Sequence, residues 1–407
     1  MDRTERQKLA ISRWIKSGGK GTILASTGFG KSFITRMLVQ SFVSRNPSFQ
    51  VLIGVPTMIL KDQWTRDLAK ANLFINCKVE VFNTIIRHNY EVDLLVLDEL
   101  HLVPTPSFIN IFKTVKYKYF LGLTATWERL DHQELWLEKY TYICDIISIK
   151  DAVENNWLSE YRNYKVNIEV DLTEYNNCNQ KFQQLFSIFD NDFKLAMDLI
   201  KDPGKIKSWS KRKNINEKNV KGYLAAWMRM LRKRKEFIQS HPKKIEVAEK
   251  ILQARKNKKS ITFSATIKDA EKFRKYRYVL HSKQKKKENQ HIIEEFNSCS
   301  CGNLASSKAA NQGLDIKGLS VGINTAVNSS KITKTQSLGR IVRKEGDKVA
   351  EMFTIVIKGT QDENWFYNAN SGQPYIEINE KQLDDILNYK EVSTRPKTAI
   401  ENLENRF

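Results

Sequence analysis

The sequence of 407 residues lacks any apolar run close to the ~18 residues that a membrane-spanning helix needs. Its first residues, from Met1 to Lys8, also lack the apolar stretch of a signal peptide. We therefore predict a cytoplasmic protein that is neither secreted nor embedded in a membrane and that has no membrane partner.

Cysteine is scarce as well, with five residues and no Cys-x-x-Cys pair: Cys77, Cys144, Cys178, Cys299 and Cys301. This odd, scattered set indicates neither a disulfide framework nor a zinc site, so we predict free thiols in a reducing compartment. No internal repeat of the solenoid kind is present. With 41% hydrophobic and 28% charged residues, the composition is typical of a globular protein of two or three domains.

Acidic residues are rare in one stretch where basic residues gather. The formal net charge is +21, and residues 201–287 contain 29 lysines and arginines against seven aspartates and glutamates. The remainder of the chain is therefore nearly neutral. A basic block of this kind binds phosphates by releasing their counterions, which favours a nucleic acid as partner. The alternative is a solvated basic face that only serves solubility.

Short apolar segments alternate with helical patterns in the first part of the chain. Strands are predicted at residues 22–25, 51–55, 79–82, 94–97 and 120–123. Because these segments are almost entirely apolar, they are typical of parallel strands that are buried on both faces. Apolar residues between them recur at helical spacing. Residues 1–152 are therefore predicted to form an α/β domain.

The pattern changes after this domain. Residues 164–170 alternate apolar and polar side chains, which predicts a strand with one solvated face. Residues 175–250 are predicted to form a basic helical insert. Further strands at 260–263, 278–280, 303–306, 321–324 and 352–357 then predict a second α/β domain over residues 153–407. Its short C-terminal tail, after about residue 365, carries no readable motif.

The first predicted strand leads directly into Ala25-Ser26-Thr27-Gly28-Phe29-Gly30-Lys31-Ser32, followed by a helix. This is the strand–loop–helix setting of a phosphate-binding loop, with alanine at the first glycine position. Backbone N–H groups around Gly28 and Gly30 would hold a β-phosphate, Lys31 would reach the β- and γ-phosphates, and Ser32 would bind Mg²⁺. The alternative is a glycine-rich turn that binds nothing.

Three further segments carry chemistry. Asp98 and Glu99 end a buried strand, where a Mg²⁺ ligand and a base for the attacking water are needed beside the phosphate loop. Thr124-Ala125-Thr126 ends another strand. Arg340 and Arg343, three residues apart, could stabilise charge on a γ-phosphate from the second domain. Taken alone, an acidic pair or an Arg-x-x-Arg pair is more often a solvated surface feature.

Read in order, these segments resemble the motif set of superfamily 2 helicases and translocases. Gln7 resembles the adenine-reading glutamine of the family, Val55-Pro56-Thr57 its motif Ia, and Asp98 to His101 a DExH box. Thr124 to Thr126, with Arg129 and Asp131, resembles motif III. Residues 311–315 and 336–343 resemble motifs V and VI. The resemblance covers most of residues 1–360.

Within the superfamily, Gln63-Trp64, the Leu-Thr-Ala-Thr segment and Gly-Arg-x-x-Arg are similar to the XPB-like DNA translocases and the phage recombination helicase UvsW. DEAD-box RNA helicases would show Ser-Ala-Thr in motif III. The sequence departs from the pattern at Leu100, Trp127 and Gln312, none of which removes a group that hydrolysis needs. The basic composition also suits a virus or phage, in which case the protein would act in the host cytoplasm.

The resemblance implies two RecA-like parallel-sheet domains, with ATP and Mg²⁺ in the cleft between them. It implies catalytic roles for Lys31, Asp98, Glu99, Arg340 and Arg343, with Ser32 and Asp98 at the metal. It adds nucleotide contacts from Gln7, Thr27, Gly28, Phe29, Gly30, Gly313, Asp315 and Gln336. Nucleic-acid contacts are expected from Thr57, Thr126, Ser306 and Ser307, joined by Lys233, Arg234 and Lys235 of the basic insert.

The predicted function is an ATP-dependent DNA helicase or translocase that acts on single-stranded, forked or branched DNA in recombination, replication or repair, including branch migration. The resemblance suggests 3′-to-5′ movement. Two alternatives stay open: an RNA helicase with the same ATP-driven domains, and a nucleic-acid-binding scaffold that does not hydrolyse ATP.

Overall fold

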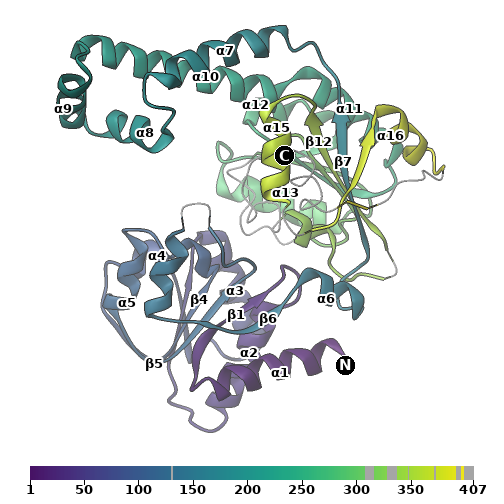
Figure 1. The fold of residues 1–407 in the computed structure, drawn as a ribbon. Helices are drawn as coiled ribbons and strands as arrows, with labels where there is room; N and C mark the ends of the chain where they lie inside the picture. Colours follow the sequence, from purple (N-terminus) through teal and green to yellow (C-terminus); the bar gives the residue numbers. More distant parts are fainter. Residues whose placement is uncertain are drawn as a thin grey trace.

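A computed structural model describes residues 1–129, 132–307, 316–327, 337–346, 348–370, 373–390 and 396–397. Two parallel β-sheets, each flanked by helices, form the body of the protein (Figure 1). The first sheet has the strand order β3-β2-β4-β5-β1-β6. Its strands are β1 (Lys20–Ala25), β2 (Val51–Val55), β3 (Cys77–Val81), β4 (Tyr90–Asp98), β5 (Val115–Thr124) and β6 (Ile143–Ile147).

The helices of this first half follow its strands, as the predicted βα alternation requires. They are α1 (Arg3–Lys16), α2 (Lys31–Val43), α3 (Met58–Lys70), α4 (Phe82–Ile85), α5 (Ile111–Thr114) and α6 (Ile149–Glu154), with 3₁₀ turns η1 (Leu100–Leu102), η2 (Phe108–Asn110) and η3 (Gln133–Lys139). The central strands are apolar because helices cover both faces of the sheet. Residues Leu94 to Leu97 of β4 are accordingly fully buried.

The second sheet has the order β13-β7-β12-β11-β8-β10-β9, again with parallel pairs throughout. Its strands are β7 (Tyr161–Ile168), β8 (Lys259–Ser264), β9 (Arg277–Leu280), β10 (Gly302–Ser307), β11 (Val321–Asn324), β12 (Ala350–Ile357) and β13 (Ile376–Asn379). Its helices are α11 (Pro242–Ala254), α12 (Ile267–Glu271), α13 (Lys286–Ser298), α15 (Gln361–Ala369) and α16 (Glu380–Leu387), with a 3₁₀ turn, η4 (Arg274–Tyr276). The prediction of two parallel-sheet α/β units is confirmed.

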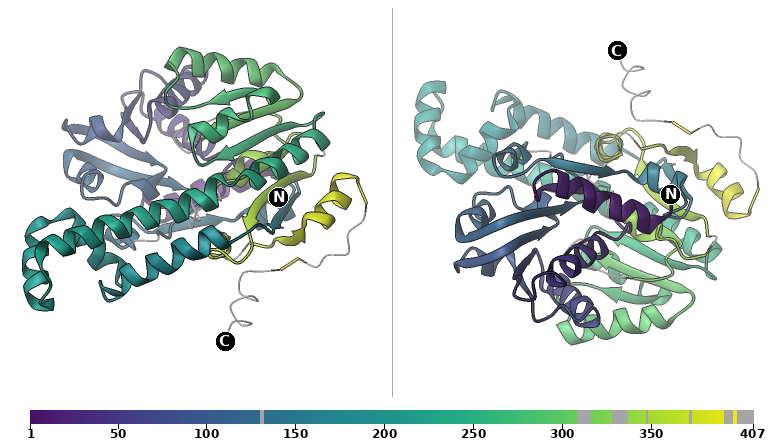
Figure 2. Two further views of the ribbon diagram at one scale, coloured as in Figure 1. Left: turned by 90° about the horizontal axis from the view of Figure 1, so that it is seen from above. Right: turned by 90° about the horizontal axis from the view of Figure 1, so that it is seen from below.

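Between β7 and α11 the chain forms a helical arm that projects beyond the second sheet (Figures 1 and 2). The arm consists of α7 (Thr173–Ser187), α8 (Phe193–Lys201), α9 (Pro203–Lys213) and α10 (Glu217–Ser240). It has a hydrophobic core of its own, which includes the fully buried Trp227. Asp202 caps α9 with Pro203 in its first turn, so a helix begins at this Asp-Pro-Gly segment.

The last part of the predicted insert does not belong to the arm. Helix α11 begins within residues 175–250 but packs Ile245, Ala248 and Ile251 into the core of the second sheet. Pro242 separates it from α10 because proline fits the first turn of a helix but not a helix interior. The basic projection therefore ends at Ser240.

Strand β7 does not have the solvated face that its alternating pattern predicts. Lys165 is fully buried because α15 packs over this face of β7, where Phe366 and Tyr367 contact its ammonium group, while β13 covers one edge of the strand and β12 the other. Its ammonium group lies 2.7 Å from a carboxylate oxygen of Glu377 and 3.3 Å from one of Glu363. Hydrogen bonds from Lys165, Lys397 and Asn167 lower the pKa of Glu377 to about 2 against the opposing effect of burial.

The C-terminal tail supplies this covering strand. β13 pairs in parallel with β7, from Ile376 opposite Tyr164 to Asn379 opposite Asn167, and α16 then packs beside it. The predicted motif-free tail is thus part of the second sheet. The short segment between Pro374 and Asn379, which caps α16, is the local sequence signal for this strand.

One buried cluster extends over both halves. It joins Phe29 and Ile34 of the first half to Ile261, Leu338 and Ile341 of the second. The predicted domain boundary between residues 152 and 153 lies inside α6, and the chain 155–160 leads from there to β7. The two sheets therefore meet through packed side chains close to the phosphate-binding loop.

Candidate nucleotide site

The loop between β1 and α2 has the geometry of an anion-binding turn. Gly28 and Gly30 have φ values of 90° and 101°, which side chains rarely adopt. Gly30 is the N-cap of α2 and supplies no side chain to bond the first N–H groups of that helix. These N–H groups and the positive end of the helix dipole are therefore available for a phosphate.

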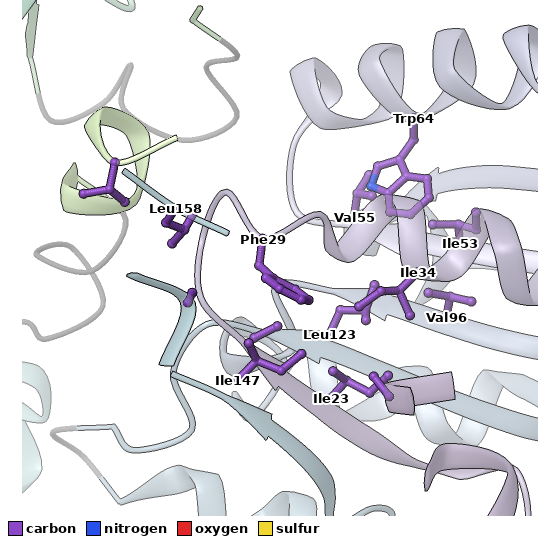
Figure 3. Close-up of a cluster of buried hydrophobic side chains, with 14 of the residues drawn as sticks. Ile23, Phe29, Ile34, Ile53, Val55, Trp64, Val96, Leu123, Ile147 and Leu158 are labelled. Atoms are coloured by element: carbon purple, nitrogen blue, oxygen red, sulfur yellow. The ribbon is translucent and has the colours of Figure 1, made fainter. Parts of the chain in front are cut away.

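Phe29 holds this loop rather than lining the cavity. Figure 3 shows its ring pointing into the hydrophobic core near Ile147 and Leu123, and it is fully buried. Its carbonyl oxygen accepts hydrogen bonds from Gln7 Nε2 at 2.9 Å and from Arg3 Nε at 3.0 Å. The Phe29 side chain, which was predicted to contact the nucleotide, thus anchors the loop. Gln7 bonds the backbone of the loop at Phe29.

Asp98 and Glu99 end β4 beside the loop. Asp98 is buried, and its Oδ2 accepts a 2.9 Å hydrogen bond from Trp64 Nε1 of α3. Burial and the neighbouring Glu99 raise the pKa of Asp98 to about 6, against the opposing effects of Lys31 and the Trp64 bond. Glu99 has a φ of 53°, and this left-handed backbone turns the chain after the strand.

His101 connects this acidic segment to the end of β5. Its Nδ1 lies 3.0 Å from Thr124 Oγ1, and Thr124 Oγ1 donates to the carbonyl oxygen of Thr126 at 2.7 Å. Arg129 donates to the carbonyl oxygen of His101. Burial, together with Lys31 and Arg129, lowers the pKa of His101 to about 3, so the ring is neutral at neutral pH. The predicted DExH-box segment and the predicted motif III segment are therefore hydrogen-bonded to each other.

The second half contributes arginines to the same cavity. Residues 337–341 form a helical turn that contacts the phosphate loop. A Cβ built at Gly28 would lie 3.1 Å from the carbonyl oxygen of Gly339 and 3.2 Å from Arg343 Cγ. A cavity of about 430 Å³ is lined from the first half by Thr27, Gly28, Gly30, Lys31, Ser32, Asp98 and Glu99, and from the second by Lys317, Arg340 and Arg343.

The residues at this cavity fit a nucleoside triphosphate with a divalent cation. Lys31 Nζ lies 3.3 Å from the Ala25 carbonyl oxygen, a neutral partner, and its positive charge also acts on Asp98. Thr27 Oγ1 is buried and has no hydrogen-bond partner. Cations from two sides and carboxylates at one end match the charge pattern of a bound triphosphate and Mg²⁺.

Some predicted residues lie outside the described part of the chain. These are Asp131, Gly313, Asp315 and Gln336. The structure therefore adds nothing on motif V or on the first residue of motif VI.

The predicted nucleic-acid residues near strand ends have different environments. Thr57 caps α3, where its Oγ1 accepts a 3.4 Å bond from Leu60 N–H. Thr126 is half-buried and lines a separate interdomain cavity of about 840 Å³. Ser306 and Ser307 are buried at the end of β10, and Ser306 Oγ bonds the carbonyl oxygen of Ser307. In this conformation, these two hydroxyl groups are not accessible to a nucleic-acid strand.

The three predicted basic residues of the arm do not act together. Lys233 and Lys235 are exposed and line a cleft of about 920 Å³ between the base of α10 and α12, with Lys268 and Lys272. Arg234 points to the other side of α10, where its guanidinium lies 4.2 Å from the centre of the Phe182 ring. Consecutive residues of a helix point in different directions, so Arg234 faces away from the cleft that Lys233 and Lys235 line. Arg234 therefore packs within the arm and is not part of the predicted basic surface.

Arg3 is a residue of the site that the sequence reasoning missed. Its guanidinium donates to the carbonyl oxygens of Gly28 and Phe29, and it lines the cavity. Burial and the nearby Arg343 lower its pKa. Arg3 precedes Gln7 by four residues, one helical turn on the same face, and this spacing could have identified it. Lys317 was missed because it follows the segment that resembles motif V, residues 311–315, without being part of it.

Comparison with known proteins places this geometry in context. Residues 243–345 match the model of the helicase conserved C-terminal domain. The chain is 25% identical over 383 residues to the DNA 3′-5′ translocase XPB2 of Sulfurisphaera tokodaii, an alignment that covers 88% of this chain and 82% of that protein.

Two solved structures have the same fold. The helicase domain of Pyrococcus furiosus Hef aligns with a TM-score of 0.55 at 15% identity, covering 89% of this chain and 97% of the other. Saccharomyces cerevisiae Dbp5 bound to RNA and ADP BeF3 aligns with a TM-score of 0.60 at 12% identity, covering 94% and 91%. The two sheets thus have the RecA-like fold of these helicase structures, and residues 243–345 of the second half match a helicase domain.

Proposed function

We propose that the protein is an ATP-dependent DNA translocase or helicase of the DExH type, related to the XPB-like and UvsW branch. One observation carries this proposal. Lys31, Asp98 and Glu99 of the first domain line the same cavity as Arg340 and Arg343 of the second. A triphosphate bound there would touch both domains, so its hydrolysis could be coupled to movement between them.

Each group has a distinct task in this proposal. Lys31 and the N–H groups of the glycine loop bind and orient the phosphates. Glu99 orients the attacking water, while Arg340 and Arg343 stabilise the charge that develops on the transferred phosphoryl group. Mg²⁺, held at Ser32 and Asp98, would supply charge neutralisation at the phosphate oxygens. Arg3, bonded to the loop, adds a further positive charge at the cavity wall.

The nucleic acid is proposed to be DNA with single-stranded, forked or branched parts. The similarity to a protein named a DNA 3′-5′ translocase supports DNA and this direction of movement. The exposed Lys233, Lys235, Lys268 and Lys272 at the base of the arm offer a second set of phosphate contacts. Neutral His101, bonded to Thr124, links the ATP cavity to the motif III segment. Action in recombination, replication or repair is consistent with such a substrate.

The test is steady-state ATPase activity with Mg²⁺ and with no nucleic acid, single-stranded, duplex or forked DNA, or RNA. We expect stimulation by DNA, strongest with forks. Stimulation by RNA alone would replace the proposal with an RNA helicase, and binding without ATPase would replace it with a scaffold.

Two substitutions define the site in the same assay. Lys31→Ala should abolish hydrolysis by weakening phosphate binding, and Glu99→Gln should stop hydrolysis while ATP and DNA still bind. Losses of about 100-fold or more in kcat are expected for groups that act on the transition state. Normal turnover of either variant would refute the site assignment.

A further inference from the structure

The chain that connects the two domains is anchored to the segment that carries Arg343. Leu158 forms an isolated antiparallel bridge with Arg343. Ser159 N–H donates to the carbonyl oxygen of Val342 at 2.8 Å, and Ser159 Oγ donates to that of Arg343 at 3.1 Å. Lys344 Nζ bonds Asn156 Oδ1. The interdomain connection thus makes paired contacts on both sides of this arginine.

The same connection also contacts the phosphate loop. The Trp157 ring meets the Phe29 ring edge-on, with centroids 5.5 Å apart. Leu158 is fully buried, and its Cδ2 lies 3.4 Å from the position of a Cβ built at Gly28. Figure 3 shows Leu158 on the side of the loop that faces the second domain. Residues 157–159 therefore lie between the loop and Arg343 and contact both.

Ser159 is the polar residue among residues 157–159, which contact the phosphate loop and Arg343. It is almost fully buried, and both its N–H and its hydroxyl are used on the backbone of residues 342 and 343. Two hydrogen bonds to adjacent carbonyls fix both the position and the direction of the Arg343 backbone. An arginine stabilises phosphoryl transfer only when its guanidinium is correctly placed, and a shift of about 1 Å can cost 100-fold in rate.

We propose that Ser159 is a positioning residue for Arg343, and that the connection 156–159 holds this arginine at the phosphate loop. The inference rests on the proposed ATPase function. It assigns the interdomain chain a part in the reaction besides joining the domains. Ser159 touches no reacting atom; it acts through the carbonyl groups that it binds.

The experiment uses Ser159→Thr and Ser159→Val, which have the same shape and differ in the hydroxyl group, together with Ser159→Ala. ATPase kcat and KM are measured on the full chain with saturating DNA, beside DNA affinity and the thermal midpoint. We expect kcat of the Val variant to be about threefold to tenfold below that of the Thr variant, because the Arg343 carbonyl loses its partner. KM and DNA affinity should change little.

A second arm separates positioning from simple stabilisation. In an Arg343→Ala background, Ser159→Ala should cause no additional loss of kcat, because the residue it positions is absent. Equal kcat for the Thr and Val variants, or the same loss with and without Arg343, would overturn the inference while leaving the ATPase intact. Absence of any ATPase in the unmodified protein would instead refute the proposed function and this inference with it.

Discussion

At the scale of the residue, Asp98 is a carboxyl group in a place that disfavours its charge. It is buried beside Glu99, and its charge is compensated by Lys31 and by hydrogen bonds from Trp64 Nε1 and the Glu99 N–H. The pKa of about 6, against 3.8 for the free group, means that the folded protein holds the proton more tightly than the unfolded chain. Stability should therefore fall as the pH rises through this interval, and stay reduced above it.

Asp98→Asn removes this cost and should stabilise the protein. At pH 8 in buffer without divalent cations, we expect the free energy of unfolding to increase by about 1–3 kcal/mol. The gain should shrink as the pH falls through this interval and disappear below about pH 3, where the wild-type carboxyl is protonated in both states. Urea unfolding at several pH values measures this, with ATPase lost throughout. A gain that did not depend on pH would show that charge burial is not its cause.

His101 has the opposite effect on stability. Its pKa is about 3 in the folded protein and near 6.5 in an unfolded chain, so the unfolded state takes up the proton first. This group's contribution is complete above pH 6.5 and is lost as the pH falls toward 3. We expect His101→Gln to flatten the loss of stability between pH 6.5 and 4.5. An unchanged acid limb in urea unfolding would contradict the assignment.

At the scale of the element, the arm separates two kinds of basic residue on one helix. Lys233 and Lys235 face the cleft beside α12, whereas Arg234 lies over the Phe182 ring. Replacing Lys233 and Lys235 with glutamine should therefore weaken DNA binding and lower its salt dependence, by a slope of about 0.9 for each lost contact with a duplex phosphate. Arg234→Gln should instead lower the thermal midpoint with little change in that slope.

A matched control uses two exposed lysines far from the cleft. Lys116 and Lys118 lie in the first part of β5, and their replacement removes the same charge. Fluorescence anisotropy with labelled DNA over a range of salt concentrations measures each slope. If the control pair lowers the slope as much as Lys233 and Lys235 do, general electrostatics and not the cleft accounts for the binding.

The elements differ in how well the sequence predicts them. Strands β1, β2, β4 and β5 contain apolar segments because both faces of the sheet are covered there, and the phosphate loop is contiguous in sequence, so both were predictable, whereas β6, which Asp145 interrupts, was not predicted. The burial of Lys165 was not, because its partner Glu377 comes 212 residues later on an adjacent strand. The hydrogen bonds of Ser159 to residues 342 and 343 were not predictable for the same reason, because long-range pairing leaves no local sequence pattern.

At the scale of the whole molecule, the two domains approach each other closely where Gly28 of the phosphate loop faces Gly339. A Cβ built at Gly339 would clash with Thr27 Cβ. Thr27 belongs to the phosphate loop, and Gly339 precedes Arg340 directly. The absence of a side chain at this position therefore allows the arginine segment to reach the nucleotide cavity.

Gly339→Ala should hold the domains apart. Because the extra methyl group meets the backbone and Cβ of Thr27, the phosphate loop and the segment that carries Arg340 and Arg343 must move apart. We expect kcat to fall by at least about tenfold, since both arginines act on the transition state. Small-angle X-ray scattering with a non-hydrolysable ATP analogue should give a larger radius of gyration than for the wild type.

Gly222→Ala in α10 is the control, because its Cβ would enter open space and the arm helix should gain up to about 1 kcal/mol of stability. Its kcat and radius of gyration should equal those of the wild type. If Gly339→Ala retained full activity and the compact radius, the contact between Gly339 and Thr27 would not be part of the active arrangement. The arginines would then have to reach the phosphates through a different approach of the domains.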